Sequence, residues 1–178
     1  MQFDVAGPFK LERFTKAQIF TKDTPKCLKA TFEDWDSGLA NAYGCYVFAL
    51  KAGQGWKPWY VGQAFKRVIW KEATNSDNLA KYNKCIGDRK GTPYLFALPW
   101  CTPSGRYSKK SGADSSPSID FLEDWLIEQS LMRNDKLINS KRTMLVRKLE
   151  VYGLLNAGPG EETKSSRQLK DVLYGPPG

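Results

Sequence analysis

The sequence of 178 residues contains no histidine. This absence excludes serine and cysteine hydrolases with a histidine base, histidine-ligated zinc hydrolases and nucleases with a histidine base. Any acid–base chemistry must therefore use tyrosine, lysine, aspartate, glutamate or cysteine. The four cysteines lie 18, 40 and 16 residues apart and form no CxxC pair. That spacing argues against a zinc ribbon or a redox motif and indicates idle thiols in a reducing compartment.

Long apolar runs are also missing. No stretch approaches the roughly 20 apolar residues of a membrane helix, and the first residues lack a basic segment followed by an apolar one. We therefore expect a soluble, uncleaved, cytoplasmic (intracellular) protein with no membrane partner. The chain is 41% hydrophobic and 13% aromatic, which is enough apolar material for one core.

Positive charge is in excess and is unevenly distributed. The chain has 27 Lys and Arg against 19 Asp and Glu, a net charge of +8. Residues 65–110 carry ten basic side chains against three acidic ones. Nucleic acid is the first partner to expect, because neutralising its dense phosphates releases counterions. Charge alone leaves open a basic surface that serves only solubility.

The order of local patterns predicts an α+β fold. Two β-prone runs, 45–50 and 56–64, flank a five-residue loop at 51–55, which predicts a hairpin. Two helical patterns follow, at 65–73 and from Asp77. A third strand is predicted at 94–100, then a polar surface loop at 101–117 and a helix at 119–133.

This order predicts a small three-stranded antiparallel sheet flanked by helices, in a domain over residues 44–140. Residues 1–43 are expected to form short strands and turns that pack on this core. Residues 141–178 form a C-terminal extension, with an apolar stretch at 144–155 and a short helix at 165–174.

Two tyrosines face each other in the predicted hairpin. If residues 51–55 form the loop, Tyr46 lies directly opposite Tyr60. Opposed residues of an antiparallel ladder point to the same face, with Cβ atoms about 5 Å apart. Tyrosine is also an ordinary strand residue with a hydrated hydroxyl, so the pairing alone assigns no chemistry.

One glutamate on the predicted helix 119–133 stands out. At 100° per residue, Glu123 lies at the margin of an apolar arc, four residues from both Ile119 and Ile127. Partial desolvation of this carboxylate is costly unless a cation or metal ion pairs with it. An exposed ion pair is the alternative. The residues of the arc are Phe121, Met132, Trp125, Leu122, Leu126 and Ile119.

These residues occur in a specific order: Gly44-Cys45-Tyr46, then Tyr60-Val61-Gly62, a basic helix, Glu123 and finally Asn139. The ordered set resembles the GIY-YIG nuclease domain over roughly residues 44–139. The resemblance implies a small antiparallel sheet flanked by helices that hydrolyses phosphodiester bonds with one divalent metal ion, Mg²⁺ or Mn²⁺.

The resemblance also implies a role for each motif residue. Tyr46 and Tyr60 are the paired tyrosines, and one of them, preferably Tyr46, helps to deprotonate the attacking water. Glu123 is the metal carboxylate and Asn139 steadies the site. One glutamate suffices, because Mg²⁺ is often held by one or two carboxylates together with phosphate and water. A phenol with a pKa near 10 needs an adjacent positive charge to act as a base at neutral pH.

The catalytic cation departs from the family pattern. The family's arginine usually lies about one helical turn further beyond Tyr60 than Arg67 does. Arg67 and Lys71 are expected to share a helix face at i and i+4. Either could stabilise the five-coordinate phosphate: Arg67 suits bidentate contact, and Lys71 matches the expected spacing.

The expected function is endonucleolytic hydrolysis of DNA, with double-stranded DNA as the first partner. A non-catalytic nucleic-acid-binding module that kept the fold is the runner-up. A protein-interaction domain that uses Trp56 and Trp59 is a third possibility. The expected DNA contacts, which position the substrate without reading sequence, are Lys66, Arg67, Arg106, Lys109 and Lys110.

Overall fold

The computed structural model describes residues 2–13, 21, 23–87, 89–108, 117–139, 143, 151 and 162–174. Contacts between Cα atoms divide the chain into two units, Met1–Asn139 and Ser140–Gly178. The second unit contains helix α6 (Lys164–Tyr174), and its bounds agree within one residue with the helix predicted at 165–174. The apolar stretch predicted at 144–155 falls outside the described residues, apart from position 151. No helix in the described ranges is long and apolar enough to cross a membrane.

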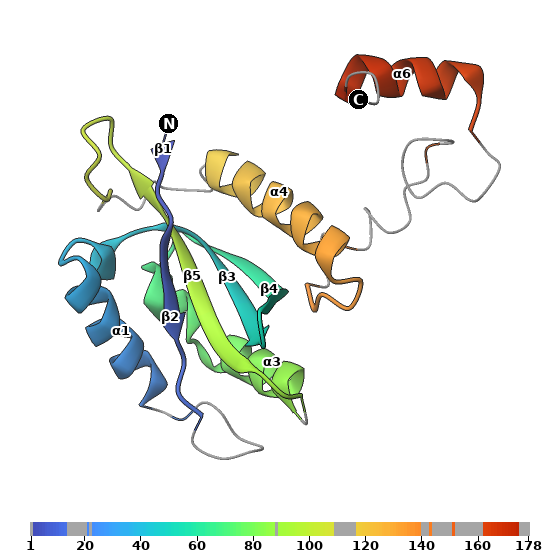
Figure 1. Cartoon of the computed structure of the whole chain (residues 1–178). Helices are drawn as coiled ribbons and strands as arrows, with labels where there is room; N and C mark the ends of the chain where they lie inside the picture. The colour runs from blue at the N-terminus through green and yellow to red at the C-terminus, as the bar shows by residue number, and fades with distance from the viewer. Residues whose placement is uncertain are drawn as a thin grey trace. The chain divides into compact units, whose positions relative to one another are not determined.

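An antiparallel sheet forms the centre of the first unit (Figure 1). Its strands are β1 (Gln2–Phe3), β2 (Ala6–Lys10), β3 (Gly44–Ala52), β4 (Gly55–Ala64) and β5 (Thr92–Cys101). β3 lies between β4 and β5, while β1 and β2 both pair with the other side of β5. The α+β class is confirmed, but the three-stranded sheet is wrong. The N-terminal segment adds strands along β5, whose backbone would otherwise be an open edge.

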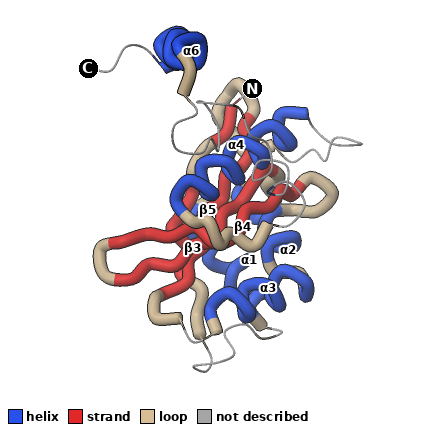
Figure 2. The backbone as a smooth tube through the Cα atoms, turned by 90° about the vertical axis from the view of Figure 1, so that its right-hand side faces the viewer, coloured by secondary structure: helices blue, strands red, loops and turns tan. Residues whose placement is uncertain are grey.

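Helices cover both faces of this sheet. Figure 1 shows α1 and α4 on opposite sides of it, and Figure 2 shows α4 in front of the strands. The larger core cluster joins Phe32 of α1, Phe48 of β3 and Tyr82 of α3, whereas a smaller one joins Val61 of β4 to Ile127 of α4. The helices of the first unit are α1 (Thr24–Trp35), the short 3₁₀ helix η1 (Leu39–Asn41), α2 (Ile69–Ala73), α3 (Ser76–Ile86) and α4 (Pro117–Arg133).

Two local predictions about helices fail for identifiable reasons. The prediction of short strands and turns over residues 1–43 misses α1. Its Pro25 lies in the first turn of the helix, where a missing N–H costs nothing. The helix predicted at 65–73 begins only at Ile69, because Val68 has an extended backbone and caps α2. The backbone N–H of Ile69 is also bound to the carbonyl of Ala42, which fixes where this helix starts.

Candidate active site

The β3–β4 hairpin brings the two motif tyrosines together, but in a different register from the predicted one. Ala52 pairs with Gly55, so the turn contains two residues, not five. Tyr46 lies opposite Gly62, and Tyr60 lies opposite Phe48. The two tyrosines are therefore diagonal neighbours, and their ring centroids are 6.2 Å apart. The predicted direct opposition is wrong, because both the turn length and a bulge after Phe48 shift the ladder.

The motif glycine Gly62 makes room for the Tyr46 ring. A Cβ atom at position 62 would lie 2.4 Å from both Cζ and the hydroxyl oxygen of Tyr46. Such a distance is far inside van der Waals contact, so the ring can cross β4 only over a residue without a side chain. Gly44, in the other motif, makes room for the backbone of β5. A Cβ atom at position 44 would lie 2.1 Å from the carbonyl oxygen of Leu98.

Tyr46 is a buried phenol with a fixed hydroxyl. The residue is only 1% exposed, and its hydroxyl accepts a hydrogen bond of 2.9 Å from Nδ2 of Asn78. Burial, followed by the nearby Tyr82 and Tyr60, raises the pKa of Tyr46 well above its ordinary value. Tyr46 therefore keeps its proton at neutral pH.

Tyr60 is half-buried and lies beside a cation from α3. Nζ of Lys81 donates a hydrogen bond of 3.3 Å to the Tyr60 hydroxyl and lies 4.8 Å from the centroid of the ring. The same Nζ donates to Oδ1 of Asn78 at 3.0 Å. Asn78 and Lys81 therefore connect the two motif tyrosines in one hydrogen-bond chain, Tyr46–Asn78–Lys81–Tyr60.

The first turn of α3 holds this chain in place. Asn75 caps the helix, and its side chain accepts a hydrogen bond of 2.9 Å from the backbone N–H of Asn78. Nδ2 of Asn78 also donates to the carbonyl of Glu72 at 2.8 Å, so both amide hydrogens are used. Sequence reasoning did not select Asn78 or Lys81. The signal in the sequence was their i, i+3 spacing, which places both on one side of the helix. In the structure Tyr82, the residue after Lys81, is fully buried.

Glu123 lies on the buried face of α4, not at its margin. The side chain is 9% exposed and stands between Ile119 and Ile127, which are 1% and 2% exposed. The charge of Glu123 also raises the pKa of Tyr46, although by less than burial and the other nearby groups do. Much of the predicted apolar arc faces outward instead, with Phe121 72% exposed and Met132 77% exposed.

Asn139 fixes the outer edge of β4. Its Oδ1 accepts from the backbone N–H of Val61 at 2.9 Å, and its Nδ2 donates to the carbonyl of Val61 at 2.7 Å. Two neighbours on the same segment bind the same strand: Nδ2 of Asn134 donates to the Pro58 carbonyl, and the backbone of Ile138 to the Trp59 carbonyl. These contacts hold in place the strand that carries Tyr60.

The predicted catalytic cations do not share a helix face. Arg67 precedes α2 and is exposed, whereas Lys71 lies on α2 with Nζ 5.3 Å from the ring centroid of Trp70. Within the described ranges, neither one hydrogen-bonds to a motif tyrosine, and Lys81 does so instead.

The predicted DNA contacts fall in several places. Lys66 is exposed beside Phe65, and Arg106 is exposed in a turn after β5. Lys109 and Lys110 lie outside the described residues. Trp59, predicted to be exposed, is only 5% exposed because it packs in the larger core, while Trp56 is 37% exposed.

The donor set fits a hard cation that needs few protein ligands. Among the described residues there is no group of three or more Cys, Asp and Glu side chains that could hold a metal ion. Glu123 is the one buried carboxylate in this described part of the chain, and its charge acts on the Tyr46 phenol. Mg²⁺ tolerates such a site, because it usually keeps several waters and binds substrate phosphate directly.

Comparison of the chain with protein-family models, curated proteins and solved structures finds no match. The geometry of the site therefore carries the functional argument.

Proposed function

We propose that this protein is a GIY-YIG-like, metal-dependent endonuclease that hydrolyses phosphodiester bonds of DNA. The observation that carries the proposal is the hydrogen-bond chain Tyr46–Asn78–Lys81–Tyr60 on β3, β4 and α3. A fold needs no ammonium group on a half-buried strand tyrosine, since an exposed hydroxyl can bind water instead. A proton-transfer site does need a positive charge at that position.

Tyr60 is the better candidate for the general base. Its hydroxyl is partly accessible and accepts a hydrogen bond from the Lys81 ammonium. In this step Tyr60 Oη takes the proton of the attacking water while its own phenolic proton passes to solvent. Tyr46, with its raised pKa and buried hydroxyl, holds Asn78 in position and acts on the reaction only through that residue.

Glu123 would hold a Mg²⁺ or Mn²⁺ ion, with water and a substrate phosphate as the other ligands. The bound ion would supply Lewis-acid stabilisation of the charge that develops on the phosphate. Asn139 binds both backbone groups of Val61, the residue after Tyr60, and so helps to hold Tyr60 in place. Exposed cations of the first unit, such as Lys66 and Arg67, neutralise the DNA backbone around it.

Replacing Glu123 by glutamine tests the enzyme assignment. The change keeps the shape of the side chain and removes its charge. Cleavage of plasmid or linear duplex DNA in Mg²⁺ should be lost, while DNA binding should stay equal or become tighter, because one negative charge near the phosphate disappears. A Glu123→Gln protein that cleaves as fast as the wild type contradicts the proposal.

A second function has one specific observation in its favour. Arg67 and Lys71 lie on the surface without a hydrogen bond to either tyrosine in the described part of the chain, as expected if the family's catalytic cation were lost. A non-catalytic nucleic-acid-binding module would then use the same basic surface. This alternative predicts DNA binding with no Mg²⁺-dependent cleavage in the wild-type protein.

A further inference from the structure

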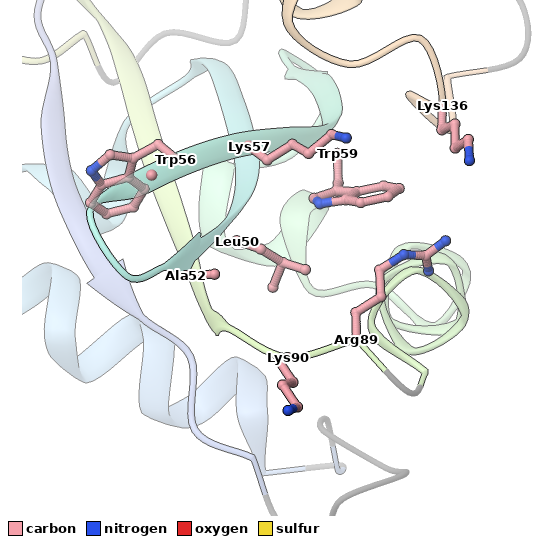
Figure 3. A pocket seen from close by; sticks show the side chains of 9 residues that line it. Leu50, Ala52, Trp56, Lys57, Trp59, Arg89, Lys90 and Lys136 are labelled. Carbon is pink, nitrogen blue, oxygen red and sulfur yellow. The ribbon is translucent and has the colours of Figure 1, made fainter.

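A pocket of about 520 Å³ opens at the hairpin end of the sheet. Four of the residues that line it are basic and none is acidic. Its volume is in the range of small-molecule sites, roughly 300 to 1,000 Å³. Figure 3 shows basic side chains from three separate segments around this space. The aromatic and basic residues of the lining are Trp56, Lys57, Trp59, Arg89, Lys90 and Lys136.

Trp59 and Arg89 form a cation–π pair at one side of the pocket. The guanidinium carbon of Arg89 lies 4.4 Å from the ring centroid of Trp59, and Nζ of Lys57 lies 5.6 Å from it. Arg89 also donates a hydrogen bond to the carbonyl of Cys85, at the end of α3, which restrains the side chain. Because Trp59 is buried and Arg89 is exposed, a ligand can reach the guanidinium. Guanidinium planes are surfaces on which unpaired nucleic-acid bases stack.

Trp56 supplies a second aromatic surface. Its ring packs against Tyr94 and Phe96, at centroid distances of 5.1 and 5.3 Å, and remains 37% exposed. Figure 3 shows Trp56 on the opposite side of the view from Arg89 and Lys136. The pocket therefore combines an apolar, planar surface with a group of cations, a pattern that suits a planar base attached to a phosphate.

The pocket and the candidate active site use neighbouring residues of β4. Trp59 and Tyr60 are consecutive, and each ring has a cation over it from α3 or the segment just after it, Arg89 and Lys81 respectively. Tyr60 pairs with Phe48, two residues before Leu50 of the pocket lining.

We propose that this pocket binds an unpaired nucleotide of the DNA strand next to the bond that is cut. The base stacks on Arg89 or Trp56, and the neighbouring phosphates contact Lys57, Lys90 and Lys136. Paired bases in a duplex are stacked on each other and cannot offer their faces, so the pocket selects DNA with a single-stranded segment. The position of the cut relative to this nucleotide rests on the proposed nuclease function, whereas the binding itself does not.

The test compares the affinity of the protein for two DNA probes by fluorescence anisotropy in EDTA, so that no cleavage occurs. One probe is a duplex with a tail of unpaired thymidines, and the other is a blunt duplex with the same number of phosphates. The wild-type protein should bind the tailed probe roughly tenfold more tightly, which is the effect typical of a stacked base. Equal affinity for the two probes, or no binding of either, overturns the proposal.

Two variants locate the preference in the pocket. Arg89→Lys keeps the charge but removes the planar group, so it should reduce the tail preference to less than about threefold and leave blunt-duplex affinity within about twofold. Lys90→Gln with Lys136→Gln should weaken binding of the tailed probe and lower its salt slope by about two. The matched control, Lys26→Gln with Lys84→Gln, removes two exposed charges outside the pocket lining and should keep the preference.

Thermal unfolding of each variant shows whether it remains folded. If Arg89→Lys does not fold, the lysine pair alone decides the outcome. An unchanged tail preference in the folded pocket variants overturns the proposal, as does equal displacement of the tailed probe by a phosphopeptide of the same charge. If the protein prefers the tailed probe but does not cleave DNA in Mg²⁺, the pocket proposal holds and the nuclease proposal fails. If the protein cleaves DNA but binds both probes equally, only the pocket proposal fails.

Discussion

Replacing Gly62 by alanine perturbs the arrangement of the motif tyrosines at a single atom. The new Cβ would lie 2.4 Å from Cζ and from the hydroxyl oxygen of Tyr46, so the ring must move away from β4. Overpacking of this kind costs about 1–3 kcal/mol. Loss of the buried hydrogen bond from Asn78 to the Tyr46 hydroxyl costs about 1–3 kcal/mol more. We therefore expect the free energy of unfolding to fall by about 2–6 kcal/mol.

Urea unfolding of three variants checks this expectation. Gly55→Ala is the matched control in the same strand, because its Cβ would meet only the Ala52 carbonyl oxygen at 3.6 Å, an ordinary contact. The control should change the free energy of unfolding by less than about 0.5 kcal/mol. In a Tyr46→Ala background, Gly62→Ala should cost less than about 1 kcal/mol, because the two positions are coupled. An equal cost of Gly62→Ala with and without the Tyr46 ring would refute the reasoning.

Two further variants test the buried hydrogen bonds around the site. Burial raises the pKa of Tyr46 and of Tyr82 well above the ordinary value near 10. Above that pH only the unfolded chain loses these two protons. The free energy of unfolding should therefore fall by about 1.4 kcal/mol per pH unit for each tyrosine. Tyr46→Phe should make the fall of unfolding free energy above about pH 10 less steep by one such share. An unchanged slope would show that Tyr46 ionises normally. Asn139→Ala removes the side chain that binds the N–H and the C=O of Val61. Thermal or urea unfolding should show that the free energy of unfolding falls by about 2–3 kcal/mol. A loss below about 0.5 kcal/mol would mean that water replaces the side chain.

Local patterns in the sequence were sufficient for the hairpin and for the elements that follow it. Alternation and turn residues predicted β3, β4 and β5, and helical spacing predicted α3 and α4. The proximity of Tyr46 and Tyr60 also followed from the hairpin, even though the register was wrong. The observed diagonal pairing differs from the predicted direct pairing because the turn is shorter and a bulge follows Phe48. Turn length and bulge both depend on tertiary packing, which the local sequence does not contain.

The rest depended on contacts between distant segments. Apolar residues lie on every side of α4, so its own sequence did not predict which side packs on β4. The buried side contains Glu123, whereas Phe121 and Met132 are exposed. Likewise, nothing in residues 2–10 showed that they would pair with β5. The Lys81–Tyr60 contact joins α3 to β4 and becomes visible only when the helix is placed against the sheet.

The central claim is that Tyr60, with Lys81 beside its hydroxyl, accepts the proton of the attacking water. Single-turnover cleavage of duplex DNA in saturating Mg²⁺, measured for Tyr60→Phe and Tyr46→Phe side by side, tests it most directly. We expect Tyr60→Phe to slow cleavage by about 10²–10⁴, the range typical of a lost proton-transfer group, with little change in stability. Tyr46→Phe should slow it less while lowering the free energy of unfolding. A Tyr60→Phe protein that cleaves at the wild-type rate would contradict this account.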